Sequence, residues 1–417
     1  MLQAAVHSGT AGRRCVFEVF ARRLPDGRRY GVVAGTGRLL DALEAFRFDE
    51  DELAALVGVV DDGTIRALRE WRFTGSIWGY AEGECYFPGS PLLVVEGTFA
   101  EAVLLETLVL SVLNHDCAIA AAASRMTAAA AGRPCIEMGS RRTHERSAVA
   151  AARAAYVAGF ASTSNLEAGR TYAVPTAGTA AHAFTLLHDD ERAAFAAQVA
   201  GLGTGTTLLV DTYDVAAGVR TAVEVAGTGL GAVRLDSGDL LLLAEQVRRQ
   251  LDELGARSTR ILVTSDLDEH AIAALAVAPV DGYGVGTSLV TGSGAPTAGL
   301  VYKLAARQGA DGRLVGVAKS SVDKVGIAGR KWAMRRSSAD GVDVAEVIGV
   351  GGHRPAGTAS MRPLLVELVR DGVVVGREPL DDARSRHLRS RSALPDTATQ
   401  LSRGEPAIPT TYQQEQP

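Results

Sequence analysis

One histidine stands out because nearly all of its neighbours are small. His182 lies in the stretch VPTAGTAAHAF, residues 174–184, in which alanine, glycine and threonine predominate. A lone histidine is more often a structural residue in a packed interior. Small neighbours would also leave access and room for an imidazole that accepts a phosphoryl group or a proton. The residues by themselves leave both interpretations open.

A second segment with chemical potential is RLDSGD, residues 234–239. Arg234 could bind a carboxylate or a phosphate through two parallel hydrogen bonds. Asp236 and Ser237 could hold ribose hydroxyls or a metal-bound water. Asp239 stands where it would cap the helix predicted over the following LLLLAEQ. Capping and ligand binding are compatible, so the segment is predicted to serve either purpose or both.

Two more segments could bind anions. DGYGVGTS, residues 281–288, contains Gly284, Gly286 and Thr287, whose backbone amides and hydroxyl could surround a phosphate. The alternative is a glycine turn needed for tight packing. GSRRTHER, residues 139–146, carries Arg141 and two further arginines, which form either an anion site or a solvated surface.

Lysine is rare and confined to one short part of the chain. Arginine outnumbers lysine 39 to 4. The lysines are Lys303, Lys319, Lys324 and Lys331. Codon preference with chance clustering would explain this, as would a segment that needs compact, mobile amines near an anion.

The predicted pattern of strands and helices that must position these residues changes along the chain. Residues 1–134 indicate strands and helices, including a hairpin of CVFEVFARRL with YGVVAGTG and one long helix over 101–131. Residues 135–312 alternate short apolar runs with helical stretches, which is typical of a parallel sheet or a closed (β/α) barrel. The polar segments described above follow the apolar runs, so they are predicted to meet on one rim at the carboxyl ends of the strands.

The remaining residues, 313–417, become strand-like again. PLLVELVRDGVVVG contains an Asp-Gly hairpin signal, and the polar, proline-containing end is predicted to be partly disordered. Because both ends of the chain are sheet-like, they are expected to pack together beside the central α/β part.

Composition excludes several classes of protein. The chain has 417 residues, 47% hydrophobic and 22% charged, with a net charge of −5, which gives no reason to expect nucleic-acid binding. Four widely spaced cysteines without a CxxC pair suggest neither a zinc site nor a disulfide framework. The start lacks the order of a signal peptide, and no apolar run is expected to reach membrane-spanning length, since Glu106 interrupts AVLLETLVLSVL. A soluble, cytoplasmic protein is predicted.

Taken together, the predicted rim would suit a phosphorylated sugar and another anion. Basic side chains would hold negative groups, glycine amides would surround a phosphate, and carboxylates would hold a diol or magnesium. Glycosyl or phosphoryl transfer fits this set better than hydride transfer, because no GxGxxG opens a helix.

With these motifs in this order, the chain closely resembles the nicotinate phosphoribosyltransferase family, in particular its actinobacterial type. The resemblance covers nearly the whole chain. Its motifs are FEVFARRLPDGRRYGVVAGTGRLL, FPGSPLLVVEG, LLETLVLSVLN, GSRRTH, PTAGTAAHAF, RLDSGDL, DGYGVGTS, VYKL and KSSVDKVGIAGRKWAMR. It implies an irregular (β/α) barrel over 135–312 and a sheet-containing α+β domain built from residues 1–134 and 313–417. It also implies a homodimer with active sites near the interface.

The resemblance also implies the reaction and its residues. Nicotinate and phosphoribosyl diphosphate would give nicotinate mononucleotide and diphosphate, coupled to hydrolysis of ATP and assisted by Mg²⁺. His182 matches the family's phosphorylated histidine, and Asp236 would be catalytic. The substrate-binding positions implied are Arg141, Gly178, Thr179, Arg234, Ser237, Gly284, Gly286, Thr287, Lys324 and Arg330.

One departure from the family pattern bears on activity. Members usually begin with a segment like TDxYxLTM, whose tyrosine is thought to stack on the nicotinate of the neighbouring subunit, whereas this chain starts at MLQAAV. Either the start codon is assigned too late, or the form is truncated with impaired substrate binding. The missing segment motivates one alternative, a non-catalytic truncated paralogue. A separate alternative within the enzymes is a related phosphoribosyltransferase for nicotinamide or quinolinate.

Overall fold

The computed structural model describes residues 1–319, 327–351 and 356–413. The chain divides into two compact units. Unit 1 comprises Met1–Ala118 and Thr297–Pro417, and unit 2 comprises Ile119–Pro296. The two ends of the chain therefore fold together in one unit, as their sheet-like patterns predict.

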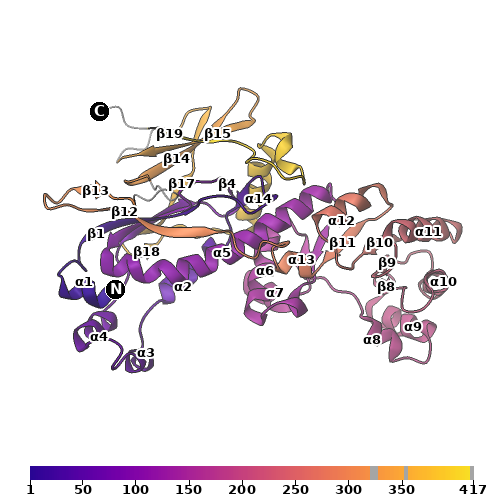
Figure 1. Ribbon diagram of the computed structural model, residues 1–417. Coiled ribbons are helices and arrows are strands. Elements are labelled where there is room, and N and C mark those ends of the chain that lie inside the picture. The colour runs from indigo at the N-terminus through magenta and orange to yellow at the C-terminus, as the bar shows by residue number, and fades with distance from the viewer. Residues whose placement is uncertain (320–326, 352–355, 414–417) are drawn as a thin grey trace. The chain divides into compact units, whose positions relative to one another are not determined.

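Unit 1 is built on antiparallel strands (Figure 1). Its seven-stranded sheet has the order β13-β12-β1-β5-β3-β17-β18, and a four-stranded sheet has the order β16-β14-β15-β19. The strands of these sheets are β1 (Arg14–Ala21), β3 (Ser76–Tyr80), β5 (Leu93–Thr98), β12 (Leu300–Gln308), β13 (Leu314–Gly316), β14 (Lys331–Ser337), β15 (Asp343–Val350), β16 (Met361–Pro363), β17 (Leu365–Arg370), β18 (Val373–Val374) and β19 (Thr410–Gln413). The short strands β2 (Gly31–Val32) and β4 (Cys85–Tyr86) pair separately.

Local turn chemistry correctly predicts one hairpin and fails for another. β17 and β18 pair across Asp371 and Gly372, whose φ angles of 46° and 79° are the positive values that an Asp-Gly turn supplies. The hairpin predicted for CVFEVFARRL and YGVVAGTG is wrong, because β1 pairs with β5 and β12 while β2 pairs with β4. In the tail predicted to be partly disordered, β19 forms a parallel pair with β15.

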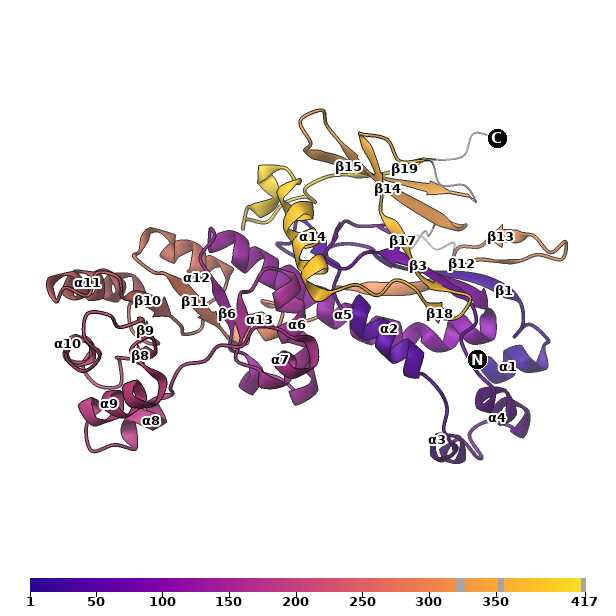
Figure 2. The same ribbon diagram turned by 180° about the vertical axis from the view of Figure 1, so that it is seen from behind.

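The helices of unit 1 include the start of a very long one. They are α1 (Leu2–His7), α2 (Thr36–Ala45), α3 (Glu50–Ala55), α4 (Asp62–Arg69), α14 (Leu380–Ser392) and the first part of α5 (Phe99–Ala129). Seen from behind, α5 runs along the antiparallel sheet (Figure 2). Phe17 of β1 packs on Phe99, with ring centroids 6.2 Å apart, and the Tyr302 hydroxyl donates to the Ala102 carbonyl at 2.8 Å.

Helix α5 corrects one sequence-based expectation. By length and composition it could cross a membrane, although no apolar run was expected to be that long. Its apolar face is nevertheless largely covered, since Leu105, Val109 and Leu113 belong to the core of unit 1. The prediction that this stretch is a buried helix is consistent with that packing, because a core helix of a soluble protein passes the same length test.

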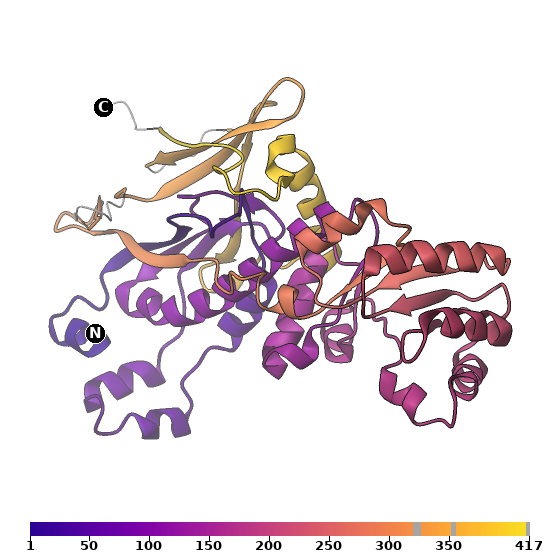
Figure 3. The same cartoon turned by 45° about the vertical axis from the view of Figure 1, so that its right-hand side comes forward.

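Unit 2 is an open, parallel α/β sheet of order β7-β6-β11-β10-β9-β8. Figure 3 shows its strands with the long helix α11 running alongside them. The strands are β6 (Cys135–Glu137), β7 (Ser162–Thr163), β8 (Thr207–Leu209), β9 (Ala232–Leu235), β10 (Arg260–Val263) and β11 (Gly282–Val285). The helices are α6 (Glu145–Val157), α7 (Leu166–Tyr172), α8 (His182–Leu186), α9 (Glu191–Leu202), α10 (Val215–Ala226), α11 (Leu240–Glu253), α12 (Glu269–Ala274) and α13 (Thr287–Val290).

This arrangement confirms the predicted fold class, an irregular (β/α) barrel together with a sheet-containing α+β unit. The barrel is irregular because β7 and β8 are edge strands, so the sheet is not closed within the described residues. A strand was expected before His182, but residues 166–172 form α7 and the following segment makes one isolated bridge, Thr163 with Thr176. The segment of small residues before His182 is therefore a loop that makes one bridge to the edge strand β7.

Candidate active site

Two of the residues predicted for the rim directly follow parallel strands, and His182 begins a short helix after a loop. His182 is the first residue of α8, Asp236 follows β9, and Gly286 follows β11. Parallel strands direct their carboxyl ends to the same edge of a sheet, and active sites of barrel enzymes form at that edge. Ser265, the second residue after β10, has a φ of 123°, a strained backbone conformation of the kind that concentrates at functional sites.

A buried aspartate that the site prediction did not include connects these loops. Asp211 follows β8, and its side chain is 1% exposed. One carboxylate oxygen lies 3.1 Å from His182 Nε2, and the other accepts hydrogen bonds of 2.8 Å from the Asp236 amide and the Ser237 hydroxyl. Asp211 therefore joins the His182 loop to the loop that follows β9. Its position after the apolar run TTLLV is the signal that could have identified it.

Asp211 also determines which nitrogen of His182 is available. When Asp211 accepts a hydrogen bond from the protonated Nε2, Nδ1 of the neutral ring keeps its lone pair and can act as a nucleophile or base. The His182 side chain is 40% exposed, so the imidazole has a protein-facing edge and a solvent-facing edge. An imidazole held by a buried carboxylate and open to solvent is an arrangement suited to phosphoryl or proton transfer.

Arg234 lies at the centre of a second group of contacts. Its guanidinium donates to the Thr264 hydroxyl at 2.9 Å, to the Thr179 hydroxyl at 2.6 Å, to the Ala180 carbonyl at 3.3 Å and to Asp236 at 2.8 Å. A guanidinium has five N–H donors, so one donor is not used by these contacts. Arg234 thereby fixes the loop before His182 and keeps a donor for an anion.

Asp236 is held in its charged form. Burial on its own would raise the pKa of Asp236, but hydrogen bonds from Thr264 and Arg234 outweigh burial and lower it. Both donors contact the same carboxylate oxygen, Oδ1. Oδ2 makes no hydrogen bond within the described residues, and the side chain is 24% exposed. This oxygen can accept a hydroxyl or a metal-bound water.

The other predicted residues of unit 2 differ in how exposed they are and in how closely their neighbours pack against them. Arg141 is exposed in a short 3₁₀ turn (Ser140–Arg142) after β6. Gly178 has open space where a Cβ would be, so steric crowding does not require glycine there. A Cβ on Gly284 would lie 2.5 Å from the Thr264 side chain, which supports the packing interpretation at that position. Thr287 is exposed at the start of α13. Asp239 caps α11, as predicted, by accepting from the Leu242 amide at 3.3 Å.

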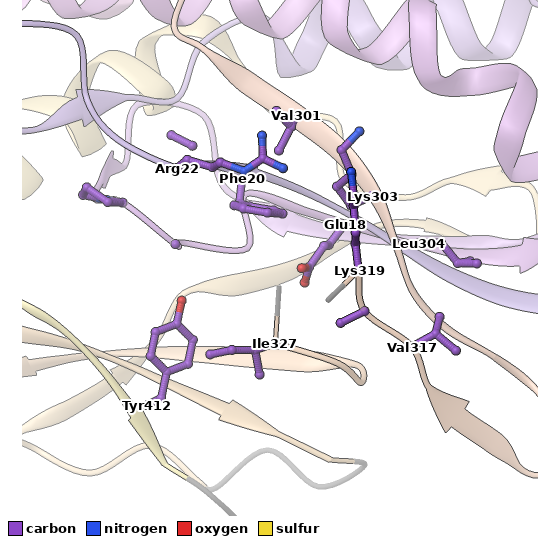
Figure 4. Close-up of a pocket in the computed structure, with 14 residues that line it drawn as sticks. Glu18, Phe20, Arg22, Val301, Lys303, Leu304, Val317, Lys319, Ile327 and Tyr412 are labelled. Atoms are coloured by element: carbon purple, nitrogen blue, oxygen red, sulfur yellow. The ribbon is translucent and has the colours of Figure 1, made fainter. Parts of the chain in front are cut away.

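The remaining two predicted residues belong to the lysine-bearing segment of unit 1. Arg330 forms an ion pair with Glu96 at 2.7 Å, and Lys324 lies outside the described residues. Lys303 and Lys319 line a pocket of about 850 Å³ together with Arg22, and Tyr412 forms one wall (Figure 4).

The carboxylate of Glu18 in this pocket is already paired with a lysine. Glu18 lies in the wall, and Lys331 Nζ is 2.6 Å from its Oε2. Burial raises the pKa of Glu18 despite the opposing effect of Lys331. Two exposed lysines and an arginine therefore give the pocket a net positive lining that suits an anion.

An open α/β barrel whose edge carries a histidine–aspartate pair beside an arginine–aspartate pair is suited to an α/β-barrel enzyme that acts on anionic substrates. Residues 1–114 match the family model of the nicotinate phosphoribosyltransferase (NAPRTase) N-terminal domain. The chain is 60% identical to nicotinate phosphoribosyltransferase pncB1 of Mycobacterium tuberculosis, covering 98% of this chain and 92% of that protein. It is 38% identical to the Bacillus subtilis nicotinate phosphoribosyltransferase, covering 80% and 71%.

The fold comparison agrees with the sequence comparison. The crystal structure of human nicotinic acid phosphoribosyltransferase superimposes with a TM-score of 0.84 at 25% identity, covering 99% of this chain and 96% of that one. The chain belongs to the nicotinate phosphoribosyltransferase family. The predicted family membership is therefore confirmed.

Proposed function

We propose that this chain transfers the phosphoribosyl group of phosphoribosyl diphosphate to nicotinate, forming nicotinate mononucleotide and diphosphate. ATP hydrolysis accompanies the transfer, which brings nicotinate into NAD synthesis. Membership of the family and the names of its 60% and 38% identical relatives support this reaction. Within this chain, the observation that carries the proposal is the His182–Asp211 pair beside Arg234 and Asp236.

In the proposed cycle, ATP first phosphorylates His182. The Nδ1 lone pair forms the bond to the γ-phosphorus, while the bond from that phosphorus to ADP breaks and its electron pair leaves with ADP. The ring then carries a positive charge, which the Asp211 carboxylate stabilises through the Nε2 proton. Because that carboxylate is buried and already oriented by Asp236 and Ser237, little reorganisation is required.

The transfer itself needs stabilisation of separated charges. Departure of diphosphate leaves an oxocarbenium-like sugar, which the nicotinate ring nitrogen attacks. Arg141 and the free donor of Arg234 would bind the nicotinate carboxylate and the sugar phosphate, with Gly178 and Thr179 lining the same space. Asp236 and Ser237 would hold the ribose hydroxyls. Gly284, Gly286 and Thr287 belong to the turn that would surround the 5′-phosphate.

Magnesium would be bound mainly through the diphosphate. Mg²⁺ prefers oxygen ligands and keeps several waters, so one free carboxylate oxygen next to a polyphosphate suffices. Asp236 Oδ2 fits that description because it is ionised, partly exposed and unused by hydrogen bonds within the described residues. The ion would neutralise charge on the leaving diphosphate.

The basic segment of unit 1 is proposed to bind polyphosphate. Lys303 and Lys319 line one pocket, and Lys324 and Arg330 follow in the same stretch of sequence. Release of Arg330 from Glu96 would free its guanidinium for an anion. We also propose a homodimer with active sites near the subunit interface. A cytoplasmic location is proposed because all four cysteines are free and buried, as suits a reducing compartment.

The decisive experiment uses His182→Ala. Wild-type protein incubated with γ-labelled ATP should acquire label that is stable to alkali, whereas His182→Ala should acquire none. The variant should still form nicotinate mononucleotide slowly without ATP, because the residues that bind the substrates remain. Loss of ATP coupling is expected to lower kcat/KM at least about 100-fold.

His188→Ala provides the matched control. His188 lies just after the same short helix, and its Nδ1 lies 2.8 Å from the Phe184 carbonyl rather than a carboxylate, so labelling should be unchanged. Label retained in His182→Ala would assign the modification to another residue. Equal or faster turnover of nicotinamide or quinolinate in the same assay would contradict nicotinate as the substrate.

A further inference from the structure

A buried carboxyl group without an assigned role contacts the turn that carries Arg141. Glu137 is the last residue of β6, and its side chain is buried. Its Oε1 accepts a hydrogen bond from the Gly139 amide, and its Oε2 accepts one from the Thr163 hydroxyl. Gly139 is the residue from which the 3₁₀ turn of Ser140–Arg142 starts. The carboxyl therefore joins this turn to the end of the edge strand β7.

Thr163 gives the carboxyl a fixed partner. Its amide donates to the Pro175 carbonyl at 2.9 Å, and its carbonyl accepts from the Ala177 amide at 2.9 Å. Its hydroxyl also accepts from the Asn165 amide at 2.9 Å, so the one proton of that hydroxyl is left for Glu137. Because Thr163 is held by its backbone, the Glu137 carboxyl is held as well.

The two residues before Arg141 are both fixed by their neighbours. The Ser140 hydroxyl accepts from the side-chain amide of Asn165 at 2.9 Å. A Cβ on Gly139 would clash with Val290 and would lie 3.0 Å from the Gly286 carbonyl oxygen, so the position requires glycine. The start of the turn is therefore held between the Glu137 carboxyl and the loop that follows β11.

Arg141 itself has nothing comparable to orient it. It is exposed, and its guanidinium makes no hydrogen bond or ion pair within the described residues. The backbone of the turn, which the Arg142 amide closes by donating to the Gly139 carbonyl at 2.8 Å, therefore determines where the guanidinium can reach.

We propose that Glu137 is a positioning residue for Arg141, because it fixes the turn from which Arg141 reaches an anionic substrate. The inference rests on the proposed function, in which Arg141 helps to bind the nicotinate carboxylate and the sugar phosphate. Glu137 is buried and acts on the substrates only through Arg141.

Removal of the carboxyl would leave two donors, the Gly139 amide and the Thr163 hydroxyl, buried without this acceptor. Buried donors are costly when they have no partner, so the turn is expected to move until they find one. Arg141 would move with it. A displacement of about 1 Å in a group that positions a substrate can lower the rate about 100-fold.

The test compares two substitutions of similar size in the full chain. Glu137→Leu has no acceptor, whereas the side-chain oxygen of Glu137→Gln can still accept from the Gly139 amide. The kcat/KM for nicotinate should fall about 100-fold in Glu137→Leu and stay within about fivefold of wild type in Glu137→Gln. Equal losses in the two variants would overturn the inference, because the hydrogen bond to Gly139 would then not matter. Glu145→Gln, whose side chain is 81% exposed, is the control and should match wild type.

A double-mutant cycle with Arg141→Ala separates positioning from a general structural effect. If Glu137 acts through Arg141, Glu137→Leu should lower kcat/KM less than about threefold in protein that already lacks the guanidinium. A further loss of about 100-fold in that background would overturn the inference. Thr163→Val, which removes the partner that holds the carboxyl, replaces Glu137→Leu in the cycle if that variant does not fold, and the same coupling is expected.

A measurement without substrates distinguishes this inference from the proposed function. Hydrogen exchange of the Gly139 amide, followed by NMR, should be about tenfold faster in Glu137→Leu than in wild type and unchanged in Glu145→Gln. Exchange that is equally slow in Glu137→Leu would contradict the role of Glu137. Failure of the wild type to form nicotinate mononucleotide would instead contradict the proposed function.

Discussion

Two clusters of opposite charges, one in each unit, use the same residue types for different purposes. In unit 2, Arg234 and Asp236 lie beside His182 and Asp211 at the strand edge. In unit 1, Arg335 lies among three carboxylates, with nitrogen–oxygen distances of 3.0 Å to Asp343, 3.0 Å to Glu346 and 3.8 Å to Glu84. We call the first the open cluster and the second the closed cluster.

Exposure distinguishes the two. The side chain of Arg335 is 0% exposed and those of its three carboxylates at most 5%, whereas His182 in the open cluster is 40% exposed. The closed cluster also receives donors from Tyr80 and Ser90 on Glu346 and from Arg362 on Glu84. The contact of Tyr80 with Glu346 joins the two sheets of unit 1, and Nε is the one nitrogen of the Arg335 guanidinium without a hydrogen-bond partner within the described residues.

The same charged residue types can either stabilise the fold or bind a ligand, depending on whether solvent reaches them. A buried ion cluster stabilises a fold only while every charge is compensated, and removing one member leaves the others unpaired. A partly exposed cluster keeps free lone pairs and donors, such as His182 Nδ1 and Asp236 Oδ2, that a ligand can use. Mutations in the closed cluster should therefore affect stability first, and mutations in the open cluster should affect catalysis first.

The largest expected effect is on the closed cluster. Arg335→Met removes the cation that pairs with the buried carboxylates of Asp343 and Glu346, while Glu84 keeps its ion pair with Arg362. The free energy of unfolding should therefore fall by about 3–5 kcal/mol. Urea denaturation at pH 7 measures this loss. The matched control is Arg336→Met, whose side chain is the next one along β14 and is exposed. A loss for Arg335→Met no larger than that for Arg336→Met would show that the cluster is not what holds the sheets together.

The second prediction concerns the open cluster. In Arg234→Lys, one ammonium replaces a guanidinium that bridges Thr264, Thr179 and Asp236, and a compact ammonium cannot reach all three. The kcat/KM for nicotinate should fall about 100-fold, equivalent to about 2.7 kcal/mol, with a loss of stability of only about 1 kcal/mol. Arg249→Lys, an exposed position on α11, is the control for the same substitution. If the free energy of unfolding fell by more than the transition-state stabilisation calculated from kcat/KM, the main role of Arg234 would be structural, as that of Arg335 is.

The sequence predicts the open cluster better than the closed one, for a physical reason. Turn and cap chemistry is local, so Asp239 at the start of α11 and the Asp371–Gly372 hairpin can be recognised from their neighbours. The alternation of strands and helices likewise brings polar residues to one edge. The pairing of β2 with β4 and the contact of Tyr80 with Glu346 join residues that are far apart in sequence, and no local pattern encodes such contacts.

Within the site, the difference between local patterns and long-range contacts also explains which features the sequence does not predict. His182 was expected after a strand, but α7 and a loop precede it, because a run of small residues has no clear period. Asp211 is recognisable as a residue after a strand, yet its bond to His182 depends on the order of strands in the sheet.

The smallest expected effect concerns a histidine beside the closed cluster. His387 of α14 is buried, and its Nδ1 lies 3.2 Å from the Gly83 carbonyl. Burial, followed by the charge of Arg391, lowers the pKa of His387 to about 3. The unfolded chain binds a proton at this histidine near its ordinary pKa of about 6.5 while the folded chain does not, so stability falls as the pH drops below that value.

Between pH 7.5 and 5.0 this single group should cost wild type about 2 kcal/mol of unfolding free energy. His387→Gln cannot titrate, so its unfolding free energy should fall by about 2 kcal/mol less over the same range, whatever its stability at pH 7.5. Urea denaturation at the two pH values measures the difference. His144→Gln, an exposed histidine at the start of α6, should behave like wild type. If His387→Gln lost as much stability as wild type on acidification, the histidine would already be protonated in the fold, and the closed cluster would have to contain one more positive charge than the contacts of Arg335 and Arg362 provide.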